Sequence, residues 1–169
     1  MNIRDGIPIT LEEVLDQREA RVSRIEQLKN EYPNHAILSL KLNIPGPIKN
    51  NHLIQTIFNR ALESLSDFKV LFSEINTNLK TGPEAFMVFE MSHSDLKQAL
   101  IKIEENHPLG RLFDMDVVGV NRKGLGYSAR KCLICDEPAV DCGRSRKHTV
   151  DELLDDIEEL VKKVYNGRD

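Results

Sequence analysis

Over about residues 36 to 120, stretches whose hydrophobic residues suit a strand take turns with stretches whose hydrophobic residues have a helical period. Four runs resemble strands and two runs between them have a helical period: 36–42, 68–75, 85–91 and 111–120 for the strands, 53–65 and 94–103 for the helices. Turn residues in NIPGPIKN at 43–50 and TGPE at 81–84 interrupt the pattern. The order β-α-β-β-α-β predicts an α+β fold with a ferredoxin-like core.

A further helix is expected on each side of this core. Thr10 and Glu13 form a capping box, and apolar residues keep a helical period from there to about Tyr32. Residues 149–164 are again amphipathic and predict a C-terminal helix, preceded by a loop segment rich in cysteine and arginine. The length of 169 residues and the 40% hydrophobic content predict a single domain over residues 1–169.

Neither a membrane span nor a secretion signal is expected. The longest apolar runs are far shorter than the roughly 18 residues that suggest a membrane helix, and residues 1–10 lack a basic-then-apolar pattern. Three cysteines packed into residues 132–142 are not laid out like a secreted disulfide framework. We therefore expect a cytoplasmic protein with reduced thiols or a metal site.

The net charge of -4 hides a basic block followed by an acidic tail. Residues 121–148 carry seven Lys or Arg against three Asp or Glu, whereas residues 149–169 carry seven acids against three bases. We interpret the tail as a solvated helix face. For the basic block, a solvated face and a surface for a phosphate-rich ligand or an acidic protein both stay open.

Two carboxylates stand inside the last strand-like run, HPLGRLFDMDVVG at 107–119. Strand alternation places Asp114 and Asp116 on one face and the large apolar residues between them on the other. Adjacent carboxylates repel each other unless a cation lies between them, and magnesium or manganese takes such oxygen ligands. A solvent-facing polar stripe is the ordinary alternative. Because Gly110 and Arg111 come just before and the basic block follows, we favour metal-assisted phosphoryl or nucleotidyl transfer.

Three thiols and one imidazole follow at a spacing that is uncommon for zinc fingers. By ligand type, Cys132, Cys135, Cys142 and His148 form an acceptable tetrahedral zinc set. A reduced, partly buried cysteine cluster is the alternative, and from the sequence we favour it over zinc. A second role for His148 is that of a general base, because the pKa of histidine lies near neutrality.

Several of these motifs together resemble one enzyme family. They are NIPGPIK at 43–49, TGPE at 81–84, HPLGRLFDMDV at 107–117, RKCLICDEPAVDCGRSRKH at 130–148 and the R-x-x-R of Arg18 and Arg21. In this order they resemble the apo-citrate lyase phosphoribosyl-dephospho-CoA transferases, also called citrate lyase holo-acyl-carrier-protein synthases, of bacterial citrate fermentation. The resemblance runs over nearly the whole chain.

The resemblance implies an enzyme that uses 2′-(5″-triphosphoribosyl)-3′-dephospho-CoA. Its phosphoribosyl-dephospho-CoA part would be joined to a serine of the citrate lyase acyl carrier (gamma) subunit through a phosphodiester, with release of diphosphate. Asp114 and Asp116 would hold magnesium and Arg111 would brace the triphosphate. His148 is a candidate for the general base, and His107 competes with it for that role. Further contacts to substrate or carrier are expected from the charged residues of the motifs: Lys49, Glu84, Arg130, Arg144 and Arg146. Neither nucleic acid nor membrane is an expected partner.

Ordinary alternatives accompany these roles. Arg111 can pair with an aspartate, Lys49 can be solvated, and Glu84 can be a turn acid. Acyl carrier proteins are acidic, so the basic block is expected to steer their encounter, with Arg122 and Lys123 at its edge and away from the phosphates. Two other classes of protein stay open: a zinc-stabilised interaction module without catalysis, and a ferredoxin-like regulator that binds a ligand.

Overall fold

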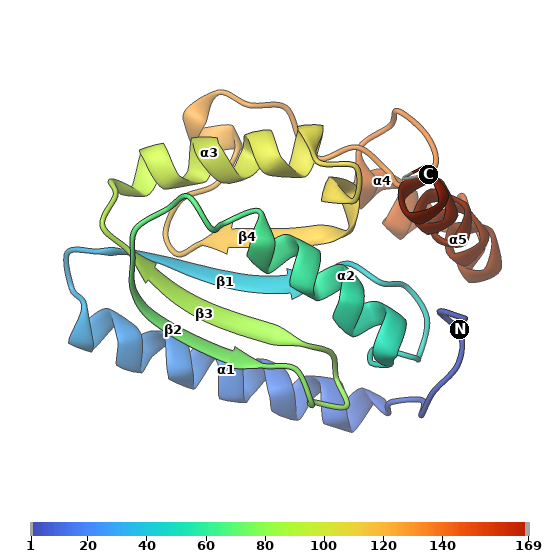
Figure 1. Cartoon of the computed structure of the whole chain (residues 1–169), viewed down its shortest axis with the longest axis horizontal. Coiled ribbons are helices and arrows are strands. Elements are labelled where there is room, and N and C mark those ends of the chain that lie inside the picture. The colour runs from blue at the N-terminus through green and yellow to red at the C-terminus, as the bar shows by residue number, and fades with distance from the viewer. Residues whose placement is uncertain (1, 168–169) are drawn as a thin grey trace.

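A four-stranded antiparallel sheet lies at the centre of the molecule (Figure 1). The computed structural model describes residues 2–167, and five α-helices surround the sheet in this range. The elements follow one another as α1 (Leu11–Glu31), β1 (Ala36–Leu42), α2 (His52–Glu63), β2 (Val70–Asn76), β3 (Glu84–Phe89), α3 (His93–Asn106), β4 (Phe113–Val117), α4 (Ala139–Ser145) and α5 (Val150–Asn166). The predicted α+β class is confirmed, and the strands lie in the order β2-β3-β1-β4.

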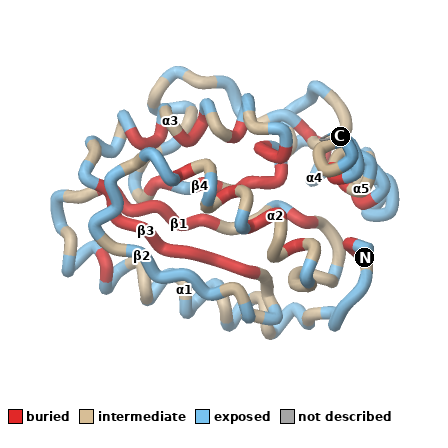
Figure 2. The backbone as a smooth tube through the Cα atoms, viewed as in Figure 1, coloured by how far each residue is buried: buried red, intermediate tan, exposed pale blue. Residues whose placement is uncertain are grey.

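One face of the sheet carries the main hydrophobic core. Alternate residues of the central strands point to it, and α2, α3 and α5 pack against it. The largest buried side chains come from strands and helices alike: Leu38, Leu40, Phe58, Phe89, Leu100 and Phe113. Each contributes about 1.5–3 kcal/mol when fully buried. Figure 2 shows this burial along β1, β3 and β4 and on the inner turns of α2 and α3.

The other face of the sheet is covered by α1. Leu28 of α1 packs against Ile37 of β1 and against Phe86 and Val88 of β3, in a second and smaller core cluster. The helix begins as predicted, since the Thr10 hydroxyl accepts a hydrogen bond from the Glu13 backbone N–H at 3.2 Å. Figure 1 shows α1 along β2 and β3, with β4 at the far edge of the sheet.

Several predicted boundaries differ from those of the structure, and the last strand and α3 are the clearest cases. The run at 111–120 forms a strand only at Phe113–Val117, because Gly110–Leu112 form a turn of 3-10 helix. A Cβ at Gly110 would lie 2.3 Å from the Glu104 carbonyl oxygen, so this close approach requires glycine. The cap of α3 is Ser92 and not the predicted Ser94, since the Ser92 hydroxyl accepts from the Asp95 backbone N–H at 3.1 Å and the helix begins at His93.

The predicted cysteine- and arginine-rich loop contains the short helix α4. It leads into α5, whose predicted start is confirmed by a complete capping box: Thr149 and Glu152 each bond the other's backbone N–H at 3.1 Å. Helix α5 then buries Leu154, Ile157 and Val161 against the main core. Within residues 2–167, each helix is too short or too polar to cross a bilayer.

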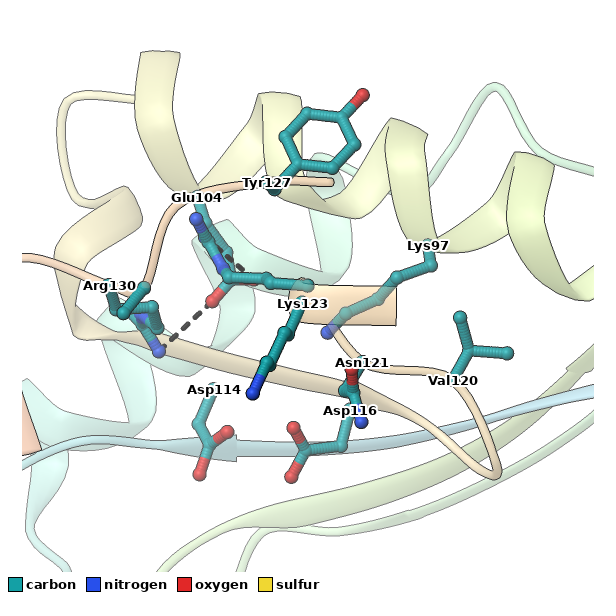
Figure 3. A pocket seen from close by; sticks show the side chains of 11 residues that line it. Lys97, Glu104, Asp114, Asp116, Val120, Asn121, Lys123, Tyr127 and Arg130 are labelled. Carbon is teal, nitrogen blue, oxygen red and sulfur yellow. Dashed lines mark ion pairs between the residues drawn. The ribbon is translucent and has the colours of Figure 1, made fainter. Parts of the chain in front are cut away.

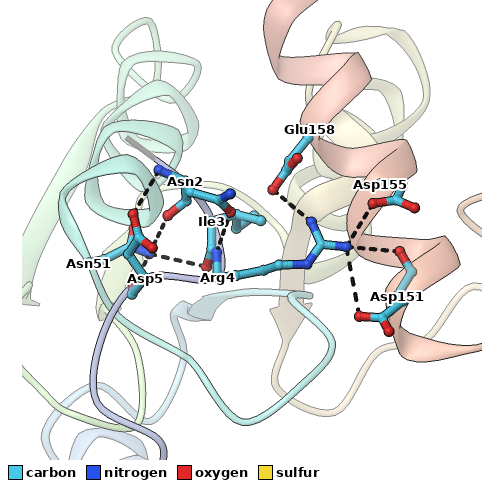
Figure 4. Close-up of polar contacts among 8 residues, drawn as sticks. All are labelled: Asn2, Ile3, Arg4, Asp5, Asn51, Asp151, Asp155 and Glu158. Carbon is cyan, nitrogen blue, oxygen red and sulfur yellow. Dashed lines mark hydrogen bonds and ion pairs between the residues drawn. The ribbon is translucent and has the colours of Figure 1, made fainter.

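The N-terminal segment is held between α2 and α5 by two side chains (Figure 4). Arg4 contacts Glu158 and Asp155 of α5 at 2.7 Å each. Asn51 caps α2 by accepting from the Ile54 N–H at 2.9 Å. Its amide nitrogen also donates to the carbonyls of the N-terminal segment, at Asn2 (3.4 Å), Ile3 (3.1 Å) and Asp5 (2.8 Å).

Asn51 is therefore expected to stabilise the fold through two separable sets of bonds. Asn51→Ala should lower the free energy of unfolding by about 2 kcal/mol, because it removes both the helix cap and the bonds to the N-terminal segment. Asn51→Asp keeps the cap acceptor but loses the donor, and should fall between Asn51→Ala and wild type in urea unfolding. Asn78→Ala, at an exposed loop position, is the control. An Asn51→Asp variant as stable as wild type would show that the donor bonds contribute nothing.

Candidate active site

A row of charged side chains crosses the sheet on the face opposite to the main core. The register of β1 against β4 places Lys41 opposite Asp114 and Ser39 opposite Asp116. Lys41 Nζ lies 3.0 Å from Asp114 Oδ2 and 3.9 Å from Asp116 Oδ2. The predicted placement of both aspartates on one face, with buried Phe113, Met115 and Val117 on the other, is confirmed. The cation between the carboxylates is the Lys41 ammonium.

The two aspartates differ in their surroundings. The side chain of Asp114 is 32% exposed and that of Asp116 is 62% exposed. Desolvation by the surrounding protein and the charge of Asp114 raise the pKa of Asp116, while Lys41 acts in the opposite direction. Because Asp116 is this exposed, the repulsion from Asp114 is the cause that the geometry supports best. One lysine therefore faces two carboxylates.

A cavity of about 440 Å³ lies beside the two aspartates (Figure 3). Its wall carries four cationic side chains from α3 and from the segment after β4: Lys97, Arg122, Lys123 and Arg130. Lys97 is buried and its Nζ donates to the Met115 carbonyl of β4 at 2.9 Å. Figure 3 shows Lys97, Lys123 and Arg130 on the side of the cavity that faces Asp114 and Asp116. An anionic ligand in this cavity would meet fixed positive charge on several sides.

Glu104 of α3 holds two of these cations. It is only 4% exposed and lies 3.0 Å from Arg130 Nη1 and 3.5 Å from Arg122 Nη2. Burial raises the pKa of Glu104, and the charges of Arg130, Lys97 and Arg122 oppose that rise. Arg122 and Lys123, which were expected at the edge of the basic block and away from the phosphates, both line the cavity beside the aspartates. Where the phosphates bind stays a prediction.

A smaller cavity, of about 110 Å³, continues the charged row beyond Lys41. Glu84 is buried at its wall, where it lies 3.1 Å from Arg21 Nη2 and accepts from Gln17 Nε2 at 2.6 Å. Lys49 also lines this cavity; its Nζ donates to the Ile44 carbonyl, and burial lowers the pKa of Lys49. Glu84 thus orients Arg21 of the R-x-x-R motif.

Arg111 and His148 make their contacts outside the charged row. Arg111 Nη1 donates to the Cys132 carbonyl at 3.0 Å and to the Leu133 carbonyl at 3.3 Å. The backbone carbonyl of Arg111 accepts from Arg130 Nη2 at 2.9 Å. His148 lies with the cysteines, so its placement does not support a role as base. The phosphate role of Arg111 stays a prediction.

The predicted cysteine and histidine set meets in space. One ligand atom from each of Cys132, Cys135, Cys142 and His148 lies within 4.8 Å of every other. Burial and the neighbouring sulfurs raise the pKa of Cys142 to about 12. All three cysteines are free thiols. Arg144 and Arg146, at the end of α4, are exposed to solvent, where their predicted contacts remain open to a partner.

Sequence reasoning missed Lys41 and Lys97. Lys41 is the only charged residue of the strand AILSLKL, a signal that could have found it, since a lone charge in a central strand requires a partner. Lys97 lies on the apolar side of α3, with Leu96, Leu100 and Ile101 buried nearby. A lysine in an otherwise apolar helix face indicates a specific acceptor or a functional site.

The fold and the charged row define an α+β protein whose edge strand carries two carboxylates beside a cavity lined with cations. A family model described as apo-citrate lyase phosphoribosyl-dephospho-CoA transferase matches residues 9–164. Proteins named "probable apo-citrate lyase phosphoribosyl-dephospho-CoA transferase" from Vibrio cholerae and Streptococcus pyogenes are 37% and 35% identical to the chain. Both cover 95% of this chain, over 96% and 90% of their own lengths. The chain belongs to this family, as its motifs predicted.

Lys41→Met should reveal the counter-ion of the aspartate pair. We expect the pKa of Asp116 to rise further, because desolvation and Asp114 already raise it and Lys41 holds it down. Carbon-detected NMR titration of the aspartate carboxyls measures this shift. Lys69→Met is the matched control, since it removes an exposed lysine that pairs with Glu90. The assignment of Lys41 is refuted if its variant and wild type titrate alike at Asp116.

Proposed function

We propose that the chain transfers a phosphoribosyl-dephospho-CoA group to the acyl carrier subunit of citrate lyase. The donor is 2′-(5″-triphosphoribosyl)-3′-dephospho-CoA and the acceptor is a serine hydroxyl of the carrier. Family membership supports this proposal. The observation that carries it is the aspartate pair of β4, which lies beside a cavity lined with four cations. We also propose that the core is ferredoxin-like, which the sheet order β2-β3-β1-β4 supports.

The reaction requires charge stabilisation more than covalent chemistry by the protein. The serine oxygen attacks the phosphorus next to the ribose, a serine–phosphorus ester bond forms, and the bond from that phosphorus to the diphosphate breaks. The hydroxyl proton is released. Negative charge grows on the leaving diphosphate, and the side chains best placed to bind it are Arg130, Lys123 and Arg122. Glu104 orients the two arginines, so little reorganisation is needed when charge develops.

The aspartate pair fits a hard divalent cation such as magnesium. Both carboxylates are on the same face of β4, both are accessible, and their mutual repulsion is only partly offset by Lys41. Asp114 and Asp116 would hold the ion, which would neutralise charge on the reacting phosphates. Lys41 would remain beside Asp114 and help to orient it. Lys49 and Arg21, in the neighbouring smaller cavity, would bind a more distant part of the donor.

The carrier would approach the cavity over the basic segment. Its exposed cations lie on both sides of the cysteine cluster, at Lys131, Arg144, Arg146 and Lys147. Lys131 and Lys147 pair with the exposed Asp136 and Glu137. Glu104, which holds Arg122 and Arg130, holds none of the four, so they would be able to meet an acidic surface. We place this reaction in the cytoplasm, where citrate lyase would be assembled.

Transfer can be measured directly on the carrier. The protein, apo carrier, triphosphoribosyl-dephospho-CoA and magnesium are mixed, and the intact carrier is weighed by mass spectrometry. We expect a gain equal to one phosphoribosyl-dephospho-CoA group, with diphosphate released in step. A carrier with its acceptor serine replaced by alanine is the control and should gain nothing. If wild-type carrier keeps its mass, the chain is a binding or regulatory protein instead.

The aspartates should be required for turnover but not for folding. Asp114→Asn and Asp116→Asn preserve shape and remove one charge each, so we expect each to lower the transfer rate about 100-fold or more. The unfolding midpoint should change little. Asp67→Asn, at an exposed turn after α2, is the matched control and should transfer at the wild-type rate. Near-normal turnover of either site variant in excess magnesium would exclude a metal-binding role for that residue.

A further inference from the structure

The cysteine and histidine cluster has the geometry of a tetrahedral metal site. Its four ligand atoms lie within 4.8 Å of one another. Cys135 Sγ and Cys142 Sγ are 3.5 Å apart. Sulfurs bound to one tetrahedral zinc at about 2.3 Å lie roughly 3.8 Å apart. The observed spacing therefore needs little adjustment to accept a zinc ion, and it is far longer than the roughly 2.05 Å of a disulfide bond.

His148 is oriented as a metal ligand. Its Nε2 is buried and has no hydrogen-bond partner among the described residues. Its Nδ1 lies 3.9 Å from a carboxylate oxygen of Glu152, the residue that completes the α5 capping box. Zinc-bound histidines usually present their second ring nitrogen to a carboxylate or carbonyl, which fixes the tautomer. The unpartnered Nε2 is thus the nitrogen available to the cluster.

The segment that carries the cluster has almost no core of its own. Between residues 118 and 153, the only buried residues are Cys132 and Cys142. A stretch of this length that buries so little apolar surface needs a disulfide or a metal to hold one conformation. Yet it is ordered around backbone bonds such as Cys132 N–H to the Glu137 carbonyl at 2.8 Å.

We propose that Cys132, Cys135, Cys142 and His148 bind one structural zinc ion. Four protein ligands leave no open position, which is typical of structural and not catalytic zinc. The ion would tie the turn before α4, α4 itself and the start of α5 to one point. It would also hold the Cys132 carbonyl that Arg111 contacts, and Arg130 two residues earlier. The sequence alone favoured a reduced cluster; the convergence of all four ligands reverses that preference.

Metal content of the protein as purified under reducing conditions tests the site. We expect about one zinc per chain by elemental mass spectrometry, retained through dialysis. The thiols should resist a thiol reagent until a strong chelator is added. His148→Gln should lose most of the zinc, whereas His93→Gln, an exposed histidine at the start of α3, should keep it. These measurements use no substrate, so they stand whether or not transfer is observed.

Hydrogen exchange locates the effect of the ion. Chelation should raise exchange within residues 118–153 and leave β1 and β3 protected, because the sheet has its own core. Wild-type protein with no zinc above the buffer blank and three freely reactive thiols would overturn the proposal. So would a Cys135–Cys142 disulfide without zinc, or zinc that is taken up only when added and is lost on dialysis.

Discussion

The antiparallel register of β1 against β4 determines where the charges of this protein meet. It brings Lys41 opposite Asp114, and continuation into β3 brings buried Glu84 to the same end of the sheet. A slip by one residue would turn the aspartates into the main core and expose Met115. The apolar residues of β4 therefore fix the register, and the register in turn positions the candidate site. Core packing and site geometry share one cause.

The helices leave the charged row accessible because they cover the sheet unevenly. Helix α1 seals its face only with Leu28 and its neighbours, over β1 and β3. Across β4 the same face carries Asp114 and Asp116, and the segment after the strand folds alongside instead of over it. Charged side chains on an edge strand such as β4 oppose its pairing with another sheet. The same carboxylates form a polar surface that a ligand can reach, and the packed core behind β4 keeps that surface rigid.

Sequence patterns predicted those features of the structure that depend only on residues near one another in the chain. Strand alternation predicted the face of Asp114 and Asp116, and residue chemistry predicted the composition of the cysteine cluster. The lone charge of Lys41 in its strand could have been noticed, but its partner could not be predicted, because the pairing depends on a register between strands more than 70 residues apart. Arg111 was placed in the strand because nothing in the sequence shows that Gly110 touches the backbone of α3. The sequence could not show that the three cysteines and His148 meet in space. Their meeting depends on α4, a helix of seven residues that is too short to show a hydrophobic period.

The cation-lined cavity and the cysteine cluster are connected through contacts of two arginine side chains with a carboxylate and with backbone carbonyls. Arg130 contacts Glu104 with one nitrogen and the Arg111 carbonyl with another, while Arg111 contacts the Cys132 carbonyl. Three of the four cations of the cavity, Arg122, Lys123 and Arg130, therefore come from a segment that buries few residues. The conformation of this segment must be held by contacts outside the cavity. A preorganised anion site needs side chains fixed before the ligand arrives. A metal two residues beyond Arg130 would provide that rigidity without occupying the cavity.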